Sequence, residues 1–401
     1  MASAQESQMM SAGGNTLSIG GYYEFGYASA SDDFDSDDGS DSKTYGESEL
    51  FIDFSTTSDS GLTYGVQIDL EIVNGSQYGE SGAAKNAEES SLFVSGDFGT
   101  LHFGHDDNAY GRFQTWAPTH EGATSQDDNI LFGAGRLITP ATDGGSAAAI
   151  TAADADVRQA RLDAEIARNN VSDNATLDTA DAADAALATA QAARAALDPT
   201  AASTYAHNLA YTPAGQGASY DDNAKVTYIS PNFSGFTFGA SFEDSDSAED
   251  NPTSIGASYS MDLGGMGSGT SLTLTGGSYS NNADGSAKSS DAHYGASLSM
   301  GAMTLTASTY SGEHGDVDKD ATEFGIGYQV SDELSLGAAF NTAESTGSVD
   351  TEGDFQSVSG SYSIALGLKT TLAFNQFDVS DNAARTSNDG SSIVWQLEFG
   401  F

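Results

Sequence analysis

Carboxylates are the most abundant chemically active side chains in this sequence of 401 residues. The sequence contains 58 Asp and Glu residues against 13 Lys and Arg residues, which gives a formal net charge of −45. Because electrostatic attraction to phosphate would have the wrong sign, this charge excludes nucleic acid as a partner. The same charge suits a protein that handles cations or one that lives in high salt.

The other reactive side chains form no catalytic pattern. Cysteine is absent, so a disulfide framework and a thiolate metal site are both excluded. The motifs G-x-x-x-x-G-K-[ST], G-x-S-x-G and H-E-x-x-H do not occur, and the 6 histidines are scattered along the chain. His102 and His293 could each meet a serine, as in a barrel lipase, but a passive lining role is the simpler interpretation. The sequence therefore predicts no enzymatic activity.

Two acidic pairs raise the question of a metal ion. Asp106 and Asp107 form one pair, and Asp127 and Asp128 form the other. Carboxylate oxygens are the ligands that Ca²⁺ prefers, although the spacing of a dedicated calcium loop, with its Gly and distal Glu, is missing. Calcium at these four residues is therefore a hypothesis, and no other cofactor is expected.

Alternation of apolar and polar side chains predicts the elements that carry these acids. In residues 16–27, Phe25 falls on an apolar face and Glu24 falls on a polar one, and the same alternation returns in residues 46–55 and 62–73. No apolar run approaches the ~20 residues of a membrane helix, but alternating segments of ~10 residues suit a membrane barrel. A soluble β-protein would instead require every apolar face to meet another.

Repetition of the pattern favours the membrane barrel. We count about sixteen such segments, an even number, as a single-chain bacterial barrel has. Short turns, as at 300–302, alternate with longer acidic connections, as at 311–320 and 342–353. Aromatic residues near the segment ends suit two girdles at the membrane interfaces. The predicted fold is an all-β, 16-stranded antiparallel transmembrane barrel.

The stretch from residue 104 to residue 220 interrupts this repetition, after the fifth strand. We predict residues 1–15 as the N-terminal segment of the mature protein and residues 16–401 as a single barrel domain, in which residues 106–221 form a long constriction loop. Within it, the alanine-rich residues 147–198 predict a helical hairpin that breaks at residues 169–173 and ends before Pro199. The alternative is a low-complexity loop that is only partly helical.

Val157, Leu162 and Ile166 could mark one face of the first of these two helices. The apolar content of the predicted hairpin is low, so its place at the pore mouth, in the lumen or outside the barrel stays open.

Three segments resemble a known family. The final segment, SSIVWQLEFGF, is amphipathic and ends on Phe401, similar to the terminal strand that outer-membrane insertion machinery recognises. Residues 48–106, with STTSDSGL followed by LFVSGDFGTLHFG, resemble the second to fifth strands of the alphaproteobacterial, Rhodobacter-type general porins. Residues 221–244 resemble their sixth and seventh strands. The resemblance covers nearly the whole chain except about residues 140–205.

The resemblance implies a homotrimeric porin in the lipid of a Gram-negative outer membrane, through which small hydrophilic solutes and ions diffuse passively. Its third extracellular loop would fold into the lumen and narrow it. The loop acids that would then line the constriction are Asp106, Asp107, Glu121, Asp127 and Asp128. Phe401 would serve as the assembly signal.

The predicted pore wall departs from the family pattern, in which an arginine cluster faces the loop acids. Here the polar faces of the strands contribute mainly acids, and the wall residues are Glu24, Glu47, Glu49, Asp53, Asp69, Glu71, Lys225 and Lys369. Carboxylates in a narrow lumen concentrate cations, so we expect a cation-preferring channel.

Two other functions stay open at this point. The helical insert could gate or plug a channel specific for one substrate. Alternatively, the barrel could anchor a surface or adhesion protein that displays the insert.

Overall fold

The computed structural model describes most of the chain outside the long loop. The described residues are 8–12, 14–32, 42–73, 89–120, 157–164, 166–168, 179, 182–183, 185–190, 224–243, 251–264, 269–282, 288–347, 350–381 and 386–401. All structural statements below refer to these residues.

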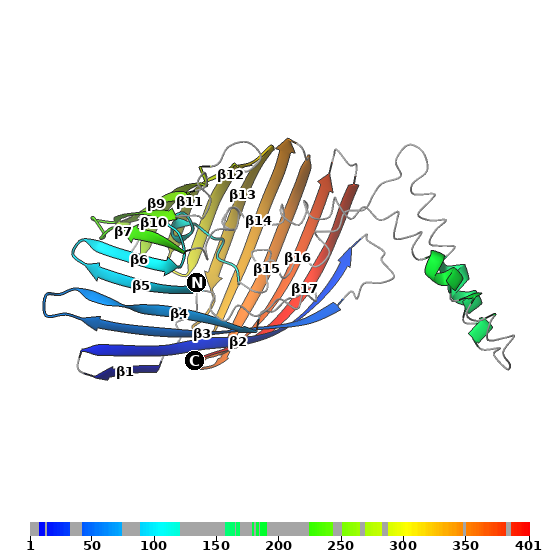
Figure 1. The fold of residues 1–401 in the computed structure, drawn as a ribbon, viewed down its shortest axis with the longest axis horizontal. Helices are drawn as coiled ribbons and strands as arrows, with labels where there is room; N and C mark the ends of the chain where they lie inside the picture. The colour runs from blue at the N-terminus through cyan, green and yellow to red at the C-terminus, as the bar shows by residue number, and fades with distance from the viewer. Residues whose placement is uncertain are drawn as a thin grey trace.

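Strands dominate the described chain (Figure 1). Their bounds are β1 Gln8–Ala12, β2 Asn15–Asp32, β3 Ser42–Thr57, β4 Thr63–Val73, β5 Glu89–Gly96, β6 Gly99–His105, β7 Ala224–Ile229, β8 Phe236–Glu243, β9 Thr253–Asp262, β10 Thr270–Ser280, β11 Ser289–Met300, β12 Met303–His314, β13 Val317–Gln329, β14 Leu334–Gly347, β15 Thr351–Ala365, β16 Leu368–Asp381 and β17 Thr386–Gly400. A short 3₁₀ turn, η1 Gly111–Phe113, follows β6.

The sheet closes on itself. Every strand from β2 onward pairs antiparallel with the next, and β17 returns to β2 with the register Gly390↔Asp32 to Gly400↔Tyr22. Among the described residues, β2 to β17 therefore form a closed ring of sixteen strands, which confirms the predicted fold class. The ring leaves no open sheet edge, as a barrel in lipid requires.

The first strand, β1, was not part of the sequence prediction. It pairs with the beginning of β2, from Gln8↔Ile19 to Ala12↔Asn15. The backbone of Phe401 binds the same edge of β2 a little further along, where its N–H donates to the Gly21 carbonyl over 3.0 Å. Strand β1 and Phe401 thus lie end to end along one edge of β2.

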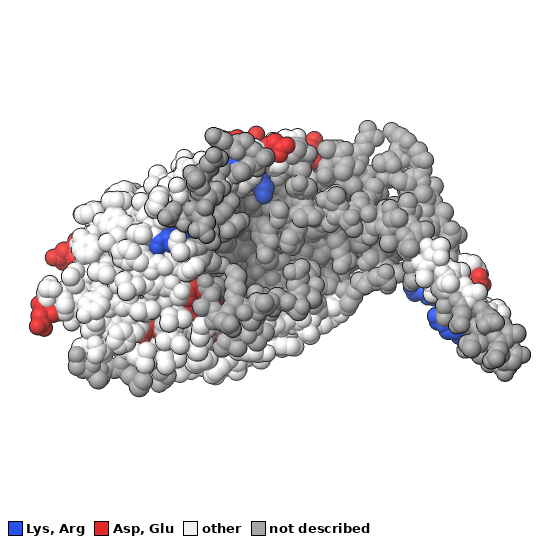
Figure 2. All heavy atoms as spheres, in the orientation of Figure 1, with Lys and Arg blue, Asp and Glu red and all other residues white. Residues whose placement is uncertain are grey.

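The two faces of the barrel wall are inverted relative to a soluble protein. On β2, Tyr23 and Tyr27 are 51% and 43% exposed on the outside, whereas Glu24 is 5% exposed on the inside. The same alternation of exposed apolar and buried polar side chains follows the ring, for example Phe374 beside Asn375 on β16. In Figure 2 the described outer surface is accordingly mostly uncharged. This surface suits contact with lipid, and the polar side forms the inner wall.

Strand length corrects one sequence expectation. Residues 311–320 and 342–353 were expected to be long acidic connections, but β12 and β13 run through the first range with only the two-residue turn 315–316 between them. Gly315 at this turn has a φ of 66°, which favours glycine. The outward residues Asp318 and Asp320 are exposed carboxylates while the inward Val317 and Ala321 are buried, so the apolar outer face that marks a lipid-facing strand is missing here.

The insert in the long loop is helical where the structure describes it. Residues 157–164 and 166–168 are helical, as expected, and Figure 1 draws them beyond the barrel, at the end opposite the short turns. Leu162 and Ile166 are 54% and 56% exposed while Val157 is buried, so the three do not share one environment. The break at residues 169–173 lies outside the described residues, and the hairpin stays a prediction. No described helix is long and apolar enough to cross a membrane.

Candidate pore-lining site

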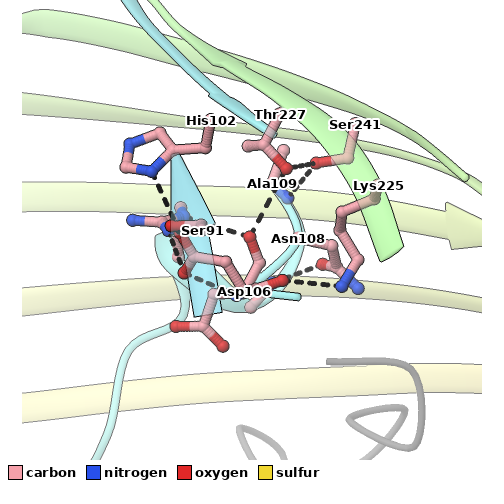
Figure 3. Close-up of polar contacts among 11 residues, drawn as sticks. Ser91, His102, Asp106, Asn108, Ala109, Lys225, Thr227 and Ser241 are labelled. Atoms are coloured by element: carbon pink, nitrogen blue, oxygen red, sulfur yellow. Dashed lines mark hydrogen bonds and ion pairs between the residues drawn. The ribbon is translucent and has the colours of Figure 1, made fainter. Parts of the chain in front are cut away.

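The long loop begins with an anchored carboxylate. Asp106, which directly follows β6, is 7% exposed. It accepts a hydrogen bond from the Ser91 hydroxyl over 3.0 Å, lies 3.0 Å from His102 Nδ1, and forms an ion pair with the Arg112 guanidinium (Figure 3). Burial alone would raise the pKa of Asp106, but the hydrogen bond from His102 and the charge of Arg112 hold that pKa below its ordinary value. Asp106 therefore fixes the loop to β5 and β6.

A lysine and two hydroxyls of β7 and β8 continue this attachment. Lys225, which is buried, donates from Nζ to the backbone carbonyl of Asp106 over 2.6 Å. Thr227 and Ser241 share a hydrogen bond of 2.8 Å, and the Ser241 hydroxyl accepts from the backbone N–H of Ala109 over 2.7 Å (Figure 3). These contacts lay the loop against the inner wall.

The turn η1 packs on the next strands. The ring of Tyr110 meets the imidazole of His293 edge to face, with centroids 4.5 Å apart. His293 Nε2 lies 3.2 Å from the carbonyl oxygen of Phe113. Both Tyr110 and His293 are almost fully buried, so this contact is part of the wall rather than of the open lumen.

The loop then crosses to the far side of the ring. Thr115 and Thr275 share a hydrogen bond of 2.6 Å, and the backbone N–H of Ala117 donates to the Glu323 carboxylate over 2.9 Å. His120 ends the described part of the loop, with Nδ1 2.7 Å from the Ser359 hydroxyl and Nε2 2.8 Å from that of Ser335. Residues 106–120 therefore follow the inner wall from β7 to β15.

Glycines on the inner wall make room for this loop. A Cβ at Gly256 would lie 2.2 Å from the carbonyl oxygen of Ala109, and a Cβ at Gly337 would lie 2.6 Å from that of Pro118. Real Cβ atoms do not approach backbone oxygens so closely, so these two positions admit the loop only as glycine.

The predicted wall acids gather on the part of the ring that the described loop does not touch. Cross-strand registers place them at inner-wall positions on three successive strands, namely Glu24 on β2, Glu47, Glu49 and Asp53 on β3, and Asp69 and Glu71 on β4. The side chain of Glu71 lies outside the described side chains. Both predicted wall lysines are engaged elsewhere, because Lys225 binds the loop and Lys369 forms an ion pair of 2.7 Å with Glu398.

The predicted constriction acids divide into two groups. Asp106 and Asp107 are described, and the Asp106 carboxylate is an anchor of the loop. Glu121, Asp127 and Asp128 lie outside the described residues. The described part of the chain contains no group of three or more His, Asp or Glu side chains that could hold a metal ion, so calcium stays a prediction.

A serine, a histidine and an aspartate meet on β11 and β12. The Ser289 hydroxyl lies 3.0 Å from His314 Nδ1, and His314 Nε2 lies 2.9 Å from the Asp291 carboxylate. Ser289 is only 4% exposed, so its hydroxyl is not presented to solvent as a nucleophile. The contacts cross-link the two strands.

Sequence reasoning missed the residues that seat the loop. Arg112, His120 and Glu323 carry no local motif, and Glu323 lies 206 residues from its partner Ala117. The short spacing of Asp106 and Arg112 is the one local pattern that could have suggested an ion pair.

A family model described as Gram-negative porin matches residues 1–214 and 186–383 of the chain. A comparison with curated protein sequences finds no match.

Solved structures of outer membrane proteins share the fold. The loop L8 deletion mutant of OmpT, an outer membrane protein of Vibrio cholerae, aligns with a TM-score of 0.59 at 11% identity, covering 97% of this chain and 100% of that one. The trimer form of OmpT aligns with a TM-score of 0.57 at 10% identity over 96% and 99% of the two chains. An anion-selective porin from Comamonas acidovorans aligns with a TM-score of 0.56 at 13% identity over 96% and 100%. At these identities the likeness shows the fold alone.

Substitution of Gly256 tests the seat of the loop. In Gly256→Ala, the new methyl group meets the Ala109 carbonyl and the Phe113 ring, so the loop must move off the wall into the lumen. We expect a smaller single-channel conductance and a loss of about 1–3 kcal/mol of stability, as overpacking costs. Gly360→Ala, whose Cβ meets nothing nearer than a Leu336 methyl at 3.2 Å, is the matched control. Equal conductance in both variants would contradict the described seat.

Protonation of His120 should loosen the far end of the loop. Burial, with a smaller effect of the Lys369 charge, lowers the pKa of His120 from 6.5 to about 4. The unfolded chain therefore binds a proton before the folded one does, so the stabilisation by His120 is complete above pH 6.5 and is lost as the pH falls toward 4.

Hydrogen exchange of the peptide 106–120 measures this effect. We expect the extra protection of the wild type over His120→Gln, which does not titrate, to shrink between pH 6.5 and about 4. A difference that stays constant over this range would contradict the role assigned to His120.

Proposed function

Because the chain belongs to the Gram-negative porin family, we propose that it forms a water-filled outer-membrane channel through which small hydrophilic solutes and ions diffuse passively. The observation that carries this proposal is the inverted wall, with exposed aromatic side chains outside and carboxylates, amides and hydroxyls inside. Passive diffusion needs neither a nucleophile nor a cofactor. The apolar outer belt supports residence in the lipid of the outer membrane.

We further propose that the channel prefers cations. Glu47, Glu49 and Asp53 of β3 and Asp69 of β4 take inward positions on the wall, without a lysine or arginine between them. Low-dielectric walls focus the field of such carboxylates and raise the local cation concentration. A structural neighbour of the same fold is described as anion-selective, so the preference must come from the charges of this chain rather than from its architecture.

Assembly as a homotrimer and a place among the Rhodobacter-type general porins are also proposals. The trimer form of OmpT shares the fold, and the Rhodobacter-type assignment is supported by the segments around residues 48–106 and 221–244. Molar mass in detergent, corrected for bound detergent, tests the first proposal, because three copies are expected and a single copy would contradict it.

Reversal potential under a KCl gradient tests the channel and its preference in one measurement. We expect a steady conductance with a cation-selective potential in the wild type. The triple variant Glu49→Gln, Asp53→Asn, Asp69→Asn should lower the permeability ratio of K⁺ to Cl⁻ by about two- to tenfold, because it removes three carboxylates from the lumen.

The triple variant Asp59→Asn, Asp97→Asn, Asp332→Asn removes the same charge from exposed short turns and serves as its control. Anion selectivity of the wild type, or an equal shift in both triple variants, would contradict the preference. Absence of any conductance from folded protein would contradict the channel itself.

A further inference from the structure

The inner wall contains a depression next to the anchored start of the loop. It has a volume of about 380 Å³ and is lined by Thr63, Gln67, Phe93, Ser95, Thr100 and His102. These residues come from β4, β5 and β6, and the cross-strand pairs Thr63↔Ser95, Ser95↔Thr100 and Phe93↔His102 place them on the inner wall. This volume is large enough for a small organic solute, although the depression is wide open on one side.

One aromatic face and several uncharged polar groups converge in this depression. The ring of Phe93 lies beside the imidazole of His102, with centroids 6.2 Å apart. The hydroxyls of Ser95 and Thr100 share a hydrogen bond of 2.9 Å, and Gln67 contributes an amide. The Phe93 ring lies on the inner wall and cannot be buried in lipid. A solute with an apolar surface could cover it and remove that surface from water.

Carboxylates surround the depression on the side of β3. Asp53 is the direct cross-strand neighbour of Gln67. Asp69 is the next inward residue of β4, and it lies close enough to Asp53 and Glu89 to interact with both. The nearest basic side chain of the lining, His102, is already paired with Asp106 at 3.0 Å. The β3 side of the depression is therefore negatively charged, whereas the guanidinium of Arg112 is bound to the same Asp106 as His102 on the other side.

We propose that this depression is a subsite for small organic cations, in which the face of Phe93 packs against a methylated ammonium group and the carboxylates of Asp53 and Asp69 attract its charge. The face of a phenyl ring attracts cations, and the attraction is stronger beside carboxylates that lower the local potential. A neutral solute would gain only the ring and the hydroxyls, and an anion would be repelled. The inference rests on the proposed channel and names a class of solute that the channel retains during passage.

Choline and its uncharged isostere 3,3-dimethyl-1-butanol form the probe pair. Saturation-transfer NMR on the folded full-length protein in detergent reads choline binding without requiring conductance. We expect saturable binding of choline and none of the isostere at the same concentration. Phe93→Leu should weaken choline binding about two- to fivefold, as the loss of one exposed cation–π contact does.

Two further variants separate this subsite from general attraction to the wall. Asp53→Asn should also weaken choline binding, whereas Phe377→Leu, which removes an inner-wall ring of β16 away from the depression, should leave it unchanged. Equal binding in wild type and Phe93→Leu, equal loss in Phe377→Leu, or equal binding of the isostere would each overturn the subsite.

A bilayer experiment distinguishes failure of the proposed channel from failure of the proposed subsite. In KCl, choline should reduce the wild-type current along a saturating curve, and in Phe93→Leu along a curve shifted to higher concentration. Normal KCl conductance without choline binding would overturn the subsite and leave the channel intact. Choline binding without any conductance would overturn the channel and leave the subsite intact.

Discussion

Closure of the backbone hydrogen-bond ladder between β17 and β2 is the constraint on which the rest of the structure depends. A peptide group without a partner costs several kcal/mol in hydrocarbon, so a sheet that faces lipid cannot keep an open edge. Once the ring is closed, the two-residue period of a strand sends alternate side chains to lipid and to the lumen. The aromatic exterior and the acidic interior of β2 and β3 both follow from this one requirement.

The loop inside the ring meets a second constraint, because its backbone groups also need partners. The wall supplies them where the loop passes, through the Ser241 hydroxyl for Ala109 and the Glu323 carboxylate for Ala117. Glycine at residues 256 and 337 lets the backbone of the loop approach that of the strands. The inner wall thereby has one part that holds the loop through glycines, hydroxyls and the Glu323 carboxylate, and another part, on β2–β4, that carries most of the predicted wall carboxylates.

Sequence alternation sufficed to predict the strands wherever one face meets lipid. It failed at residues 311–320, where the outward residues Asp318 and Asp320 are exposed carboxylates and the apolar outer face that marks a lipid-facing strand is missing. The seat of the loop could not be predicted, because its contacts join residues more than 100 positions apart, as Lys225 joins Asp106. The sequence also did not show that Asp106 differs from the acids of the wall, because its ion pair with Arg112 is visible only in the structure.

The pairing of Asp106 with Arg112 bears on where a selective field can arise. A carboxylate held against a guanidinium and buried to 7% exposure contributes little potential to the centre of the lumen. The acids of β2–β4 stand instead on hydrogen-bonded strands that hold their positions on the inner wall. If the protein is the proposed channel, the wall carboxylates select cations over anions, whereas the anchored start of the loop affects only the width of the lumen. The electrostatic potential of these wall carboxylates does not depend on the course of the rest of the loop. Its source is a closed sheet, and the sheet must close because unpaired peptide groups are unfavourable in lipid.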